Sequence, residues 1–390
     1  MDVIKILKKI IIWEIIILSG SLFFSLCLPI FFVPLYVVTS FALFLKTRCY
    51  NVKYNFVLAF LLFVWLFINH TLINDDLTSN MPYIAMLYIV GSFFSISSLS
   101  YEFLRKYLLK YYSIICFFSI AVYILNTFFW YPRPSYMDLG SNSYLSAFVF
   151  FNVGWEGRLS SIYWEPGQFQ MVTMFILCLY SDYFVQYKKY WRQLALPVFA
   201  LGCTISTGGY LSFAILFVGV LLSLDVFKRK KYLFPFAIFL VAVFCFAIYQ
   251  SEAIQSKVRQ KESNSQSSSF YIRLNDNLGL LNMIKKRPIF GYGMETKSFN
   301  NQARKNNNLT SSNGWLCTSA ANGIIVSVYF FVFLYKGVRR NVFGIPWGYP
   351  FCALVFSQSI EYYLFFPIMF MYVFRFNGQT NHSVLKKHTH

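Results

Sequence analysis

The sequence has few charged residues for its length. Only 13% of its 390 residues are Asp, Glu, Lys or Arg, and 57% are hydrophobic. Soluble domains carry roughly 25% charged residues. Apolar runs of about 20 residues, the length with which a helix crosses a bilayer, recur along nearly the whole chain. This composition leaves no room for a separate soluble domain and predicts a single transmembrane domain over residues 1–390.

Residues and motifs that build common catalytic centres are also scarce. Four histidines are present, His70 and three in the C-terminal tail, and the eight cysteines are scattered singly without a CxxC pair. No Walker loop and no dinucleotide fingerprint occurs. These absences argue against a metal site, a Ser-His hydrolase, ATP-driven transport and redox chemistry. We therefore expect no metal and no cofactor.

The hydrophobic runs predict an all-α fold, a polytopic membrane helix bundle. We expect about eleven or twelve transmembrane helices, because the last two apolar runs are short and could form one broken helix. The predicted spans are 10–28, 30–45, 55–73, 81–99, 111–130, 168–186, 193–207, 210–226, 232–250, 315–335, 346–359 and 360–374.

Lys and Arg cluster in every second connection, which predicts that those connections face the cytoplasm. Two long connections then lie on the outer face, at about 131–167 and 251–313. Long loops in compact proteins are usually functional or disordered. Within the second loop, 263–269 is Ser-rich and has the composition of a flexible segment. Residues 272–284 have helical spacing and predict a helix lying on the membrane surface.

The formal net charge of +19 and the 46 Phe and 29 Tyr could suggest a nucleic-acid partner. Basic residues beside membrane spans are explained more simply by topology and by anionic lipid headgroups. Tyr and Trp also settle at membrane–water boundaries. We expect membrane lipids as a partner and no nucleic acid.

The first long loop ends in the sequence GRLSSIYWEPGQ, which leads directly into a predicted helix. Arg158 could bind an anion, and Glu165 precedes Pro166 at the helix start. A carboxylate at this position suits the positive end of the helix dipole, so Glu165 as a plain helix cap is an equally simple interpretation.

The second long loop is rich in cations. Arg273 is followed by the sequence IKKRPIFGYG, which contains Lys286, Arg287 and Tyr292. On the outer face these charges are not positive-inside anchors, so we expect them to bind an anionic ligand, because a guanidinium grips phosphate oxygens bidentately. Contacts with lipid headgroups or with neighbouring carboxylates are the alternative. Ser312 and Asn313, just before the tenth predicted helix, could be ordinary helix caps.

The order of these motifs resembles the bacterial O-antigen polymerase and O-antigen ligase superfamily, integral-membrane enzymes that build polysaccharide from lipid-linked repeats. The resemblance rests on Arg158 before Glu165-Pro166, on Arg273, on the run ending at Gly293, and on Ser312-Asn313 before Gly323. A ligase is expected to carry histidine where this chain has Ser312, which favours a polymerase.

The resemblance implies a membrane glycosyltransferase of lipopolysaccharide biosynthesis in the bacterial inner membrane, with its active face in the periplasm. The substrate would be an undecaprenyl-pyrophosphate-linked oligosaccharide. Catalytic roles would then fall to Glu165, Arg158 and Arg273, and substrate binding to Arg287, Lys286, Ser312, Asn313 and Tyr292. A chain-length regulator and a flippase are the protein partners that this pathway would offer.

Three other functions fit parts of the sequence. A flippase or transporter would also be apolar with about twelve helices, but transporters often show internal repeats and ionisable residues at mid-membrane. We find no repeat, and the charges inside the spans are few and near their ends. A ligase or a membrane acyltransferase is disfavoured because no suitable histidine motif is present.

Overall fold

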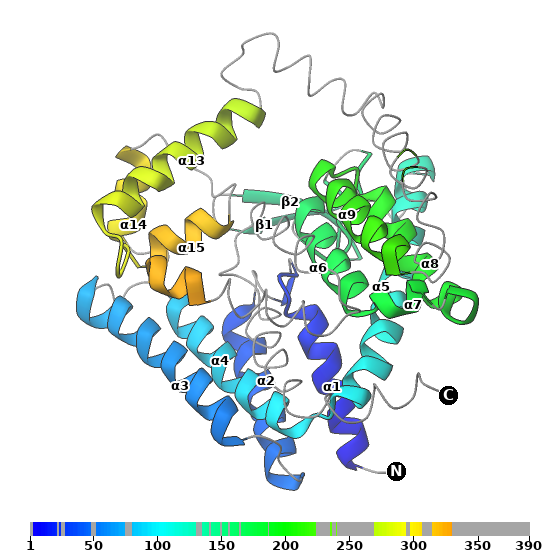
Figure 1. The fold of residues 1–390 in the computed structure, drawn as a ribbon, viewed down its shortest axis with the longest axis horizontal. Helices are drawn as coiled ribbons and strands as arrows, with labels where there is room; N and C mark the ends of the chain where they lie inside the picture. Colours follow the sequence, from blue (N-terminus) through cyan, green and yellow to red (C-terminus); the bar gives the residue numbers. More distant parts are fainter. Residues whose placement is uncertain are drawn as a thin grey trace.

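The structure is a computed structural model of the 390-residue chain (Figure 1). Apart from a few single positions and short gaps, it describes residues 3–24, 28–47, 52–74, 80–129, 135–223, 269–305 and 314–329. The predicted spans 232–250, 346–359 and 360–374 lie outside the described residues, as does most of the predicted flexible segment 263–269.

Long helices form the N-terminal part of the molecule: α1 (Val3–Ile17), α2 (Pro29–Lys46), α3 (Val52–Phe67), α4 (Met81–Ser98) and α5 (Tyr101–Phe129). A π-helical segment at Ile68–Ile73 continues α3. Three described helical stretches are long and apolar enough to cross a membrane, namely Pro29–Lys46, Asn55–Ile73 and Phe103–Phe129. Shorter apolar helices occur at Pro82–Ser98, Pro166–Leu179 and Gly208–Val220. The prediction of an all-α membrane helix bundle is confirmed.

Helices α2 and α4 pack closely against each other, and α3 and α1 flank this pair. Gly91 of α4 permits the close approach, since a Cβ atom there would lie 2.5 Å from Cε1 of Tyr36. The Tyr36 hydroxyl also pairs with the Ser95 hydroxyl at 2.8 Å. Small residues and hydroxyl pairs are typical of helix contacts in membranes, where burial of apolar surface gives no advantage over lipid.

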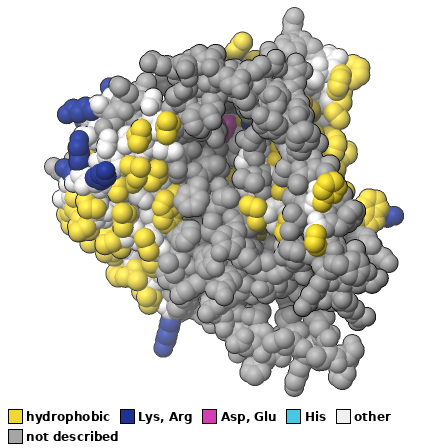
Figure 2. Space-filling view, turned by 45° about the horizontal axis from the view of Figure 1, so that its top comes forward, with side chains coloured by type: hydrophobic (Ala, Val, Ile, Leu, Met, Phe, Trp, Pro, Cys, Tyr) yellow, Lys and Arg dark blue, Asp and Glu magenta, His cyan; other side chains and the backbone are white. Residues whose placement is uncertain are grey.

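The outer surfaces of α2, α3 and α5 carry large exposed apolar side chains, such as Phe31, Val38, Phe60, Phe117 and Phe128. Hydrophobic side chains also gather over much of the described surface seen in Figure 2. Apolar patches this extensive are unusual on soluble monomers and mark membrane contact. The chain is therefore a membrane protein.

The first helix differs from its prediction. We expected a span at 10–28, whereas α1 covers Val3–Ile17 and is followed by a turn in which Gly20 has φ +89. Ser21 then forms a bridge with Tyr163, far along the chain. This pairing ends the helix, and an apolar run in the sequence gives no sign of it.

The first long loop contains a small antiparallel sheet that the sequence did not predict. Strands β1 (Ser135–Leu139), β2 (Asn142–Ala147) and β3 (Phe151–Asn152) lie in the order β1-β2-β3. In Figure 1 the β1–β2 hairpin lies between the helices of the α5–α9 side and those of the α13–α15 side.

Helices α6 (Pro166–Leu179), α7 (Ser181–Val185), α8 (Tyr187–Cys203) and α9 (Thr207–Ser223) follow the sheet. Helix α6 is almost entirely buried, and it packs on α8 and α9 while α5 packs on α8. The predicted span 168–186 is divided between α6 and α7. One hydrophobic core joins α1–α6, α8 and α9.

A second, smaller core lies beneath α13 (Ser269–Lys286), α14 (Lys297–Lys305) and α15 (Gly314–Asn322). The helix predicted at 272–284 is confirmed as part of α13, while its location on the membrane surface stays a prediction. The predicted span 315–335 is interrupted at Gly323, where φ is +87, and helical backbone resumes at 324–329.

Candidate functional site

Arg158 lies in the loop between β3 and α6 and is half-buried. Its Nε donates to the Thr204 carbonyl at 3.1 Å, and the next residue, Leu159, donates its amide to the Cys203 carbonyl at 2.9 Å. The two acceptors are the last residue of α8 and the first residue of the turn between α8 and α9. Because Nε is hydrogen-bonded, the orientation of the planar guanidinium is restrained.

Several hydrogen bonds hold the loop around Arg158, within the loop and to helix α5. The Ser160 hydroxyl donates to the backbone carbonyl of Asn152 at 2.8 Å, and the backbone amide of Asn152 donates to the Ser161 carbonyl at 2.8 Å. Ser161, at φ +62, pairs through its hydroxyl with Ser119 of α5 at 2.6 Å. A buried non-glycine residue in the left-handed region is an uncommon conformation that surrounding structure must support. The Arg158 loop is therefore preorganised.

Glu165 occupies the N-cap position of α6 with extended backbone, at φ −147 and ψ 157. Pro166 fills the first helical position, as the sequence predicted. The Glu165 side chain makes no capping hydrogen bond, although its backbone carbonyl accepts from Gln168 and Phe169 at 3.2 and 3.3 Å. Glu165 is therefore the N-cap residue of α6 by backbone geometry, at the positive end of the helix dipole, without a side-chain capping hydrogen bond.

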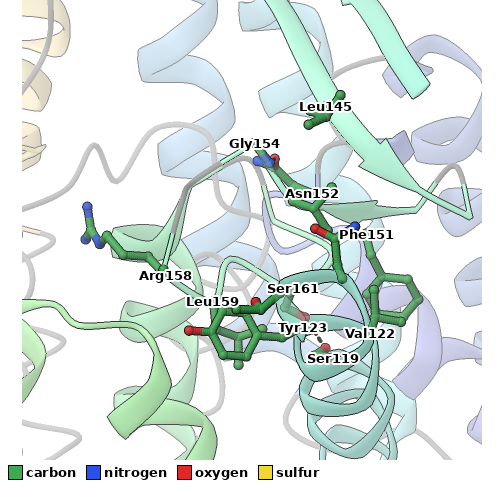
Figure 3. A pocket seen from close by; sticks show the side chains of 14 residues that line it. Ser119, Val122, Tyr123, Leu145, Phe151, Asn152, Gly154, Arg158, Leu159 and Ser161 are labelled. Carbon is green, nitrogen blue, oxygen red and sulfur yellow. Dashed lines mark hydrogen bonds between the residues drawn. The ribbon is translucent and has the colours of Figure 1, made fainter. Parts of the chain in front are cut away.

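A cavity of about 330 Å³ opens beside Arg158 (Figure 3). Its walls come from the C-terminal half of α5, from β2 and β3, and from the loop that carries Arg158. In Figure 3 the Arg158 side chain extends away from Asn152 and Ser161, so the guanidinium lies toward one side of the cavity.

Arg287 lies immediately after α13, at the start of the turn that ends at Gly293. One of its terminal nitrogens donates to Oδ1 of Asn74 at 3.0 Å, and the guanidinium lies over the Tyr292 ring at 4.8 Å. Asn74 directly follows the π-helical end of α3, and π-helical turns are frequent at functional sites. Tyr292 itself is 7% exposed, so it supports Arg287 from below rather than facing solvent.

The turn after Arg287 packs against the break between α15 and the following helix. The amides of Tyr292 and Gly293 donate to the carbonyls of Ala320 and Ala321 at 2.9 and 2.8 Å. A Cβ at Gly323 would lie 1.7 Å from the Ile289 carbonyl oxygen, and one at Gly291 would lie 2.5 Å from the Ala320 and Ala321 oxygens. Both glycines have positive φ, so only glycine satisfies the space and the conformation together.

The C-terminal end of α3 packs against the 287–293 turn and against the end of α15. Trp65 donates its indole N–H to the Asn322 carbonyl at 3.0 Å and stacks on Phe290, and Asn69 donates to the Ala321 carbonyl at 3.2 Å. These contacts join the second long loop to a membrane helix more than two hundred residues earlier. The backbone of the 287–293 turn is therefore held against α3.

The remaining predicted site residues are placed less completely. Arg273 lies in the N-terminal half of α13, and Lys286 is exposed at the C-terminal end of that helix. Ser312 and Asn313 lie outside the described residues, just before α15. The structure thus sets Arg158 on the α8–α9 side and Arg287 on the α3–α15 side. In the part of the chain that the structure describes, no three His, Cys, Asp or Glu side chains are grouped as a metal site.

The surface around Arg287 is strongly basic. Figure 2 shows Lys and Arg side chains gathered on the side of the molecule where Figure 1 places α13 and α14. The exposed cations of this region are Lys285, Lys286, Arg287, Lys297, Arg304 and Lys305. A concentration of one sign of charge raises the local concentration of anionic ligands.

Sequence reasoning missed the residues that hold the two arginines. Thr204 binds through a backbone carbonyl, which carries no sequence signal. Asn69 and Asn74 had a weak one, because amides at the outer end of an apolar span are unusual in a lipid-facing helix.

Residues 194–331 match the family model described as O-antigen ligase. This segment belongs to the O-antigen polymerase and ligase superfamily. It contains the C-terminal part of α8, all of α9 and α13–α15, and with them Arg273, Arg287, Tyr292 and Gly323. Arg158 precedes the matched segment but is bonded to its α8–α9 turn. No curated protein matches the chain.

Enzymes of the O-antigen polymerase and ligase superfamily are membrane glycosyltransferases or ligases. The match over residues 194–331 indicates an O-antigen polymerase-like or ligase-like function.

Proposed function

We propose that this protein is an O-antigen polymerase of the bacterial inner membrane. It transfers the growing glycan from undecaprenyl pyrophosphate to an undecaprenyl-pyrophosphate-linked repeat unit at the periplasmic face. The observation that carries the proposal is the double anchoring of the Arg158 loop on the α8–α9 turn, which attaches an anion-binding group of the first outer loop to the family segment.

In this reaction the bond between the anomeric carbon of the donor glycan and its pyrophosphate oxygen breaks. A hydroxyl oxygen of the acceptor sugar forms the new glycosidic bond, and undecaprenyl pyrophosphate leaves with the negative charge. Arg158 and Arg273 bind and neutralise that charge, and preorganised cations of this kind stabilise a developing anion effectively. Arg287 and Lys286 assist from the basic surface, while Tyr292 positions Arg287.

The acceptor hydroxyl must lose its proton as the new bond forms. Glu165 is our candidate for the general base, because it is the carboxylate of the first loop's Arg-x₆-Glu-Pro run. Ser312 and Asn313, before α15, would complete the substrate contacts.

Glu165→Gln tests this assignment, since glutamine keeps the shape and removes the base. We expect polymer yield to fall roughly 10²-fold or more, the usual contribution of a positioned general base, at an unchanged protein level in the membrane. Normal polymer length and yield would contradict the role, and loss of the protein from the membrane would show a structural role instead.

Polymerase is preferred to ligase because Ser312 stands where a ligase is expected to carry histidine. Ligase remains the second candidate, since the matched family model has that description. The two activities use the same lipid-linked donor and differ in the acceptor, which is a lipid-linked repeat unit for a polymerase and lipid A core for a ligase.

The deciding experiment is the lipopolysaccharide ladder on a gel, from a host that carries the matching repeat-unit genes with this gene deleted and then restored. If the protein is a polymerase, deletion of its gene leaves lipid A core that carries a single repeat unit. Accumulation of polymer that never reaches lipid A core would indicate a ligase. Loss of every repeat, with lipid-linked units trapped inside the cell, would indicate a flippase.

A further inference from the structure

We infer that the cavity beside Arg158 is a sugar subsite, and that it holds the sugar ring attached to the pyrophosphate of the lipid-linked donor. This inference rests on the proposed function and adds to it a binding site for one defined part of the substrate. Four properties of the cavity support it: its lining, its size, its single charge and its position on α5.

Apart from Arg158, the lining is uncharged and combines polar groups with aliphatic and aromatic side chains. Helix α5 contributes Ser119, Tyr123 and Asn126, and the opposite wall contributes Phe151 and Asn152. Hydroxyl and amide groups can both donate to and accept from ring hydroxyls. Aromatic rings supply the apolar contact that the C–H faces of a sugar need.

The size suits one or two sugar rings. The cavity volume of about 330 Å³ lies near the lower end of the roughly 300–1,000 Å³ found for small-molecule sites. A complete repeat unit with its lipid would not fit, so the site selects a part of the substrate.

The charge of the lining indicates where the phosphate lies. Arg158 is the charged residue among the lining side chains, and in Figure 3 its side chain extends away from Ser161 and Ser119. A neutral ring in the cavity would therefore have its anionic substituent on the Arg158 side. In a glycan linked to pyrophosphate, the sugar that directly carries the phosphate is the reducing-end sugar.

The α5 wall is a continuous stripe. Ser119, Val122, Tyr123 and Asn126 follow the i, i+3, i+4, i+7 spacing of one helix face. This stripe begins about 15 Å, at 1.5 Å per residue, before the end of the apolar stretch Phe103–Phe129. In the topology expected from the basic residues, that end faces the periplasm, where the donor's pyrophosphate would lie.

The test measures binding of the repeat-unit oligosaccharide, released from its lipid carrier by mild acid, to the purified full-length protein in detergent. Saturation-transfer NMR reports which sugar contacts the protein. Val122→Phe fills the cavity from α5, and Phe151→Ala removes an aromatic wall. Phe128→Ala, on the same helix but 74% exposed and outside the lining, is the matched control.

We expect the wild type and Phe128→Ala to bind alike, with saturation transfer strongest at the reducing-end sugar. Val122→Phe should weaken binding about tenfold, or 1.4 kcal/mol, and Phe151→Ala by a smaller factor. Failure of the wild type to bind, or equal binding by folded Val122→Phe and Phe151→Ala, would overturn the inference.

The two proposals fail separately. If deletion of the gene leaves the ladder intact while Val122→Phe still loses oligosaccharide binding, the polymerase proposal falls and the sugar subsite stands. If the ladder depends on the gene but the cavity variants bind and polymerise like the wild type, only the sugar subsite falls.

Discussion

The two arginines of the candidate site have differently built surroundings. Arg158 is half-buried, and its Nε is bonded to the backbone carbonyl of Thr204 in a loop that is itself bonded to α5 and to the α8–α9 turn. Arg287 is exposed, and side chains hold it, namely the Asn74 amide and the Tyr292 ring. A backbone anchor cannot change rotamer, whereas an exposed side-chain anchor can.

This difference suggests that Arg158 and Arg287 have different roles in the reaction, a division of work between the two arginines. The α5–α9 region belongs to the large core and can hold a charge against one point of the substrate. The α13–α15 region has a small core of its own and a surface of exposed cations, which attracts anions without fixing them closely. We therefore expect Arg158 to govern the chemical step and Arg287 to govern capture of the substrate.

The largest expected effect tests whether the α13–α15 region is a rigid unit at all. Gly323→Ala would bring a Cβ to 1.7 Å from the Ile289 carbonyl oxygen at a residue with φ +87. We expect a loss of at least about 3 kcal/mol in stability, from overpacking and left-handed strain together. Thermal unfolding of the purified protein and its level in membranes would measure the loss.

Gly202→Ala is the matched control, because a Cβ at Gly202 of α8 would meet nothing within 4 Å. It should be neutral or stabilising by roughly 0.5–1 kcal/mol, the usual gain of alanine over glycine in a helix. Equal behaviour of the two variants would mean that the glycine-mediated contact between the 287–293 turn and α15 does not hold this region together.

The next effect tests the chemical role of the half-buried Arg158. Arg158→Ala should lower polymer yield roughly 10- to 150-fold, the equivalent of one charge-assisted hydrogen bond of about 1.5–3 kcal/mol. Arg158→Lys should recover little, because an ammonium cannot keep the Nε bond to Thr204 and still present a planar fork. The ladder at matched protein level measures both variants. Arg192→Ala, an exposed arginine on α8, is the control that should match the wild type.

The helices of the N-terminal part could be predicted closely where an apolar run has clear ends. The span predicted at 30–45 became α2, Pro29–Lys46, because proline starts the helix and a basic residue ends the run. Arg158 and Arg287 could also be selected from the sequence as candidate anion-binding residues, since cations in long outer loops are not topology signals. Both depend on local sequence alone.

Tertiary contacts explain what the sequence could not show. The end of α1 is set by the bridge between Ser21 and Tyr163, and the break after α15 is set by the close approach of Ile289 to Gly323. The cavity combines a stripe on α5 with strands of the first loop, and the prediction of that loop contained no strand. In each case the partner is remote in sequence, and hydropathy has no information about it.

A smaller effect is expected at the exposed arginine. Arg287→Ala should raise the substrate concentration needed for half-maximal rate about three- to tenfold with little change in maximal rate, since an exposed charge contributes modestly. The effect should shrink as salt rises from low to physiological strength, because salt screens exposed charges. The Arg158→Ala defect should persist under the same change. A defect of Arg287→Ala in maximal rate that salt does not alter would contradict the division of work.

The smallest effect concerns how α3 holds the α15 break. Trp65→Phe removes the indole donor to the Asn322 carbonyl while keeping an aromatic ring against Phe290. One hydrogen bond lost at a part-buried site should cost about 1 kcal/mol, whereas Trp65→Ala, which also removes the stacked ring, should cost more. Thermal unfolding of the two variants separates the hydrogen bond from the stacking. If Trp65→Phe also raised the half-saturating substrate concentration as Arg287→Ala does, the two residues would act through one unit, because both attach the 287–293 turn and its neighbouring helix break to α3.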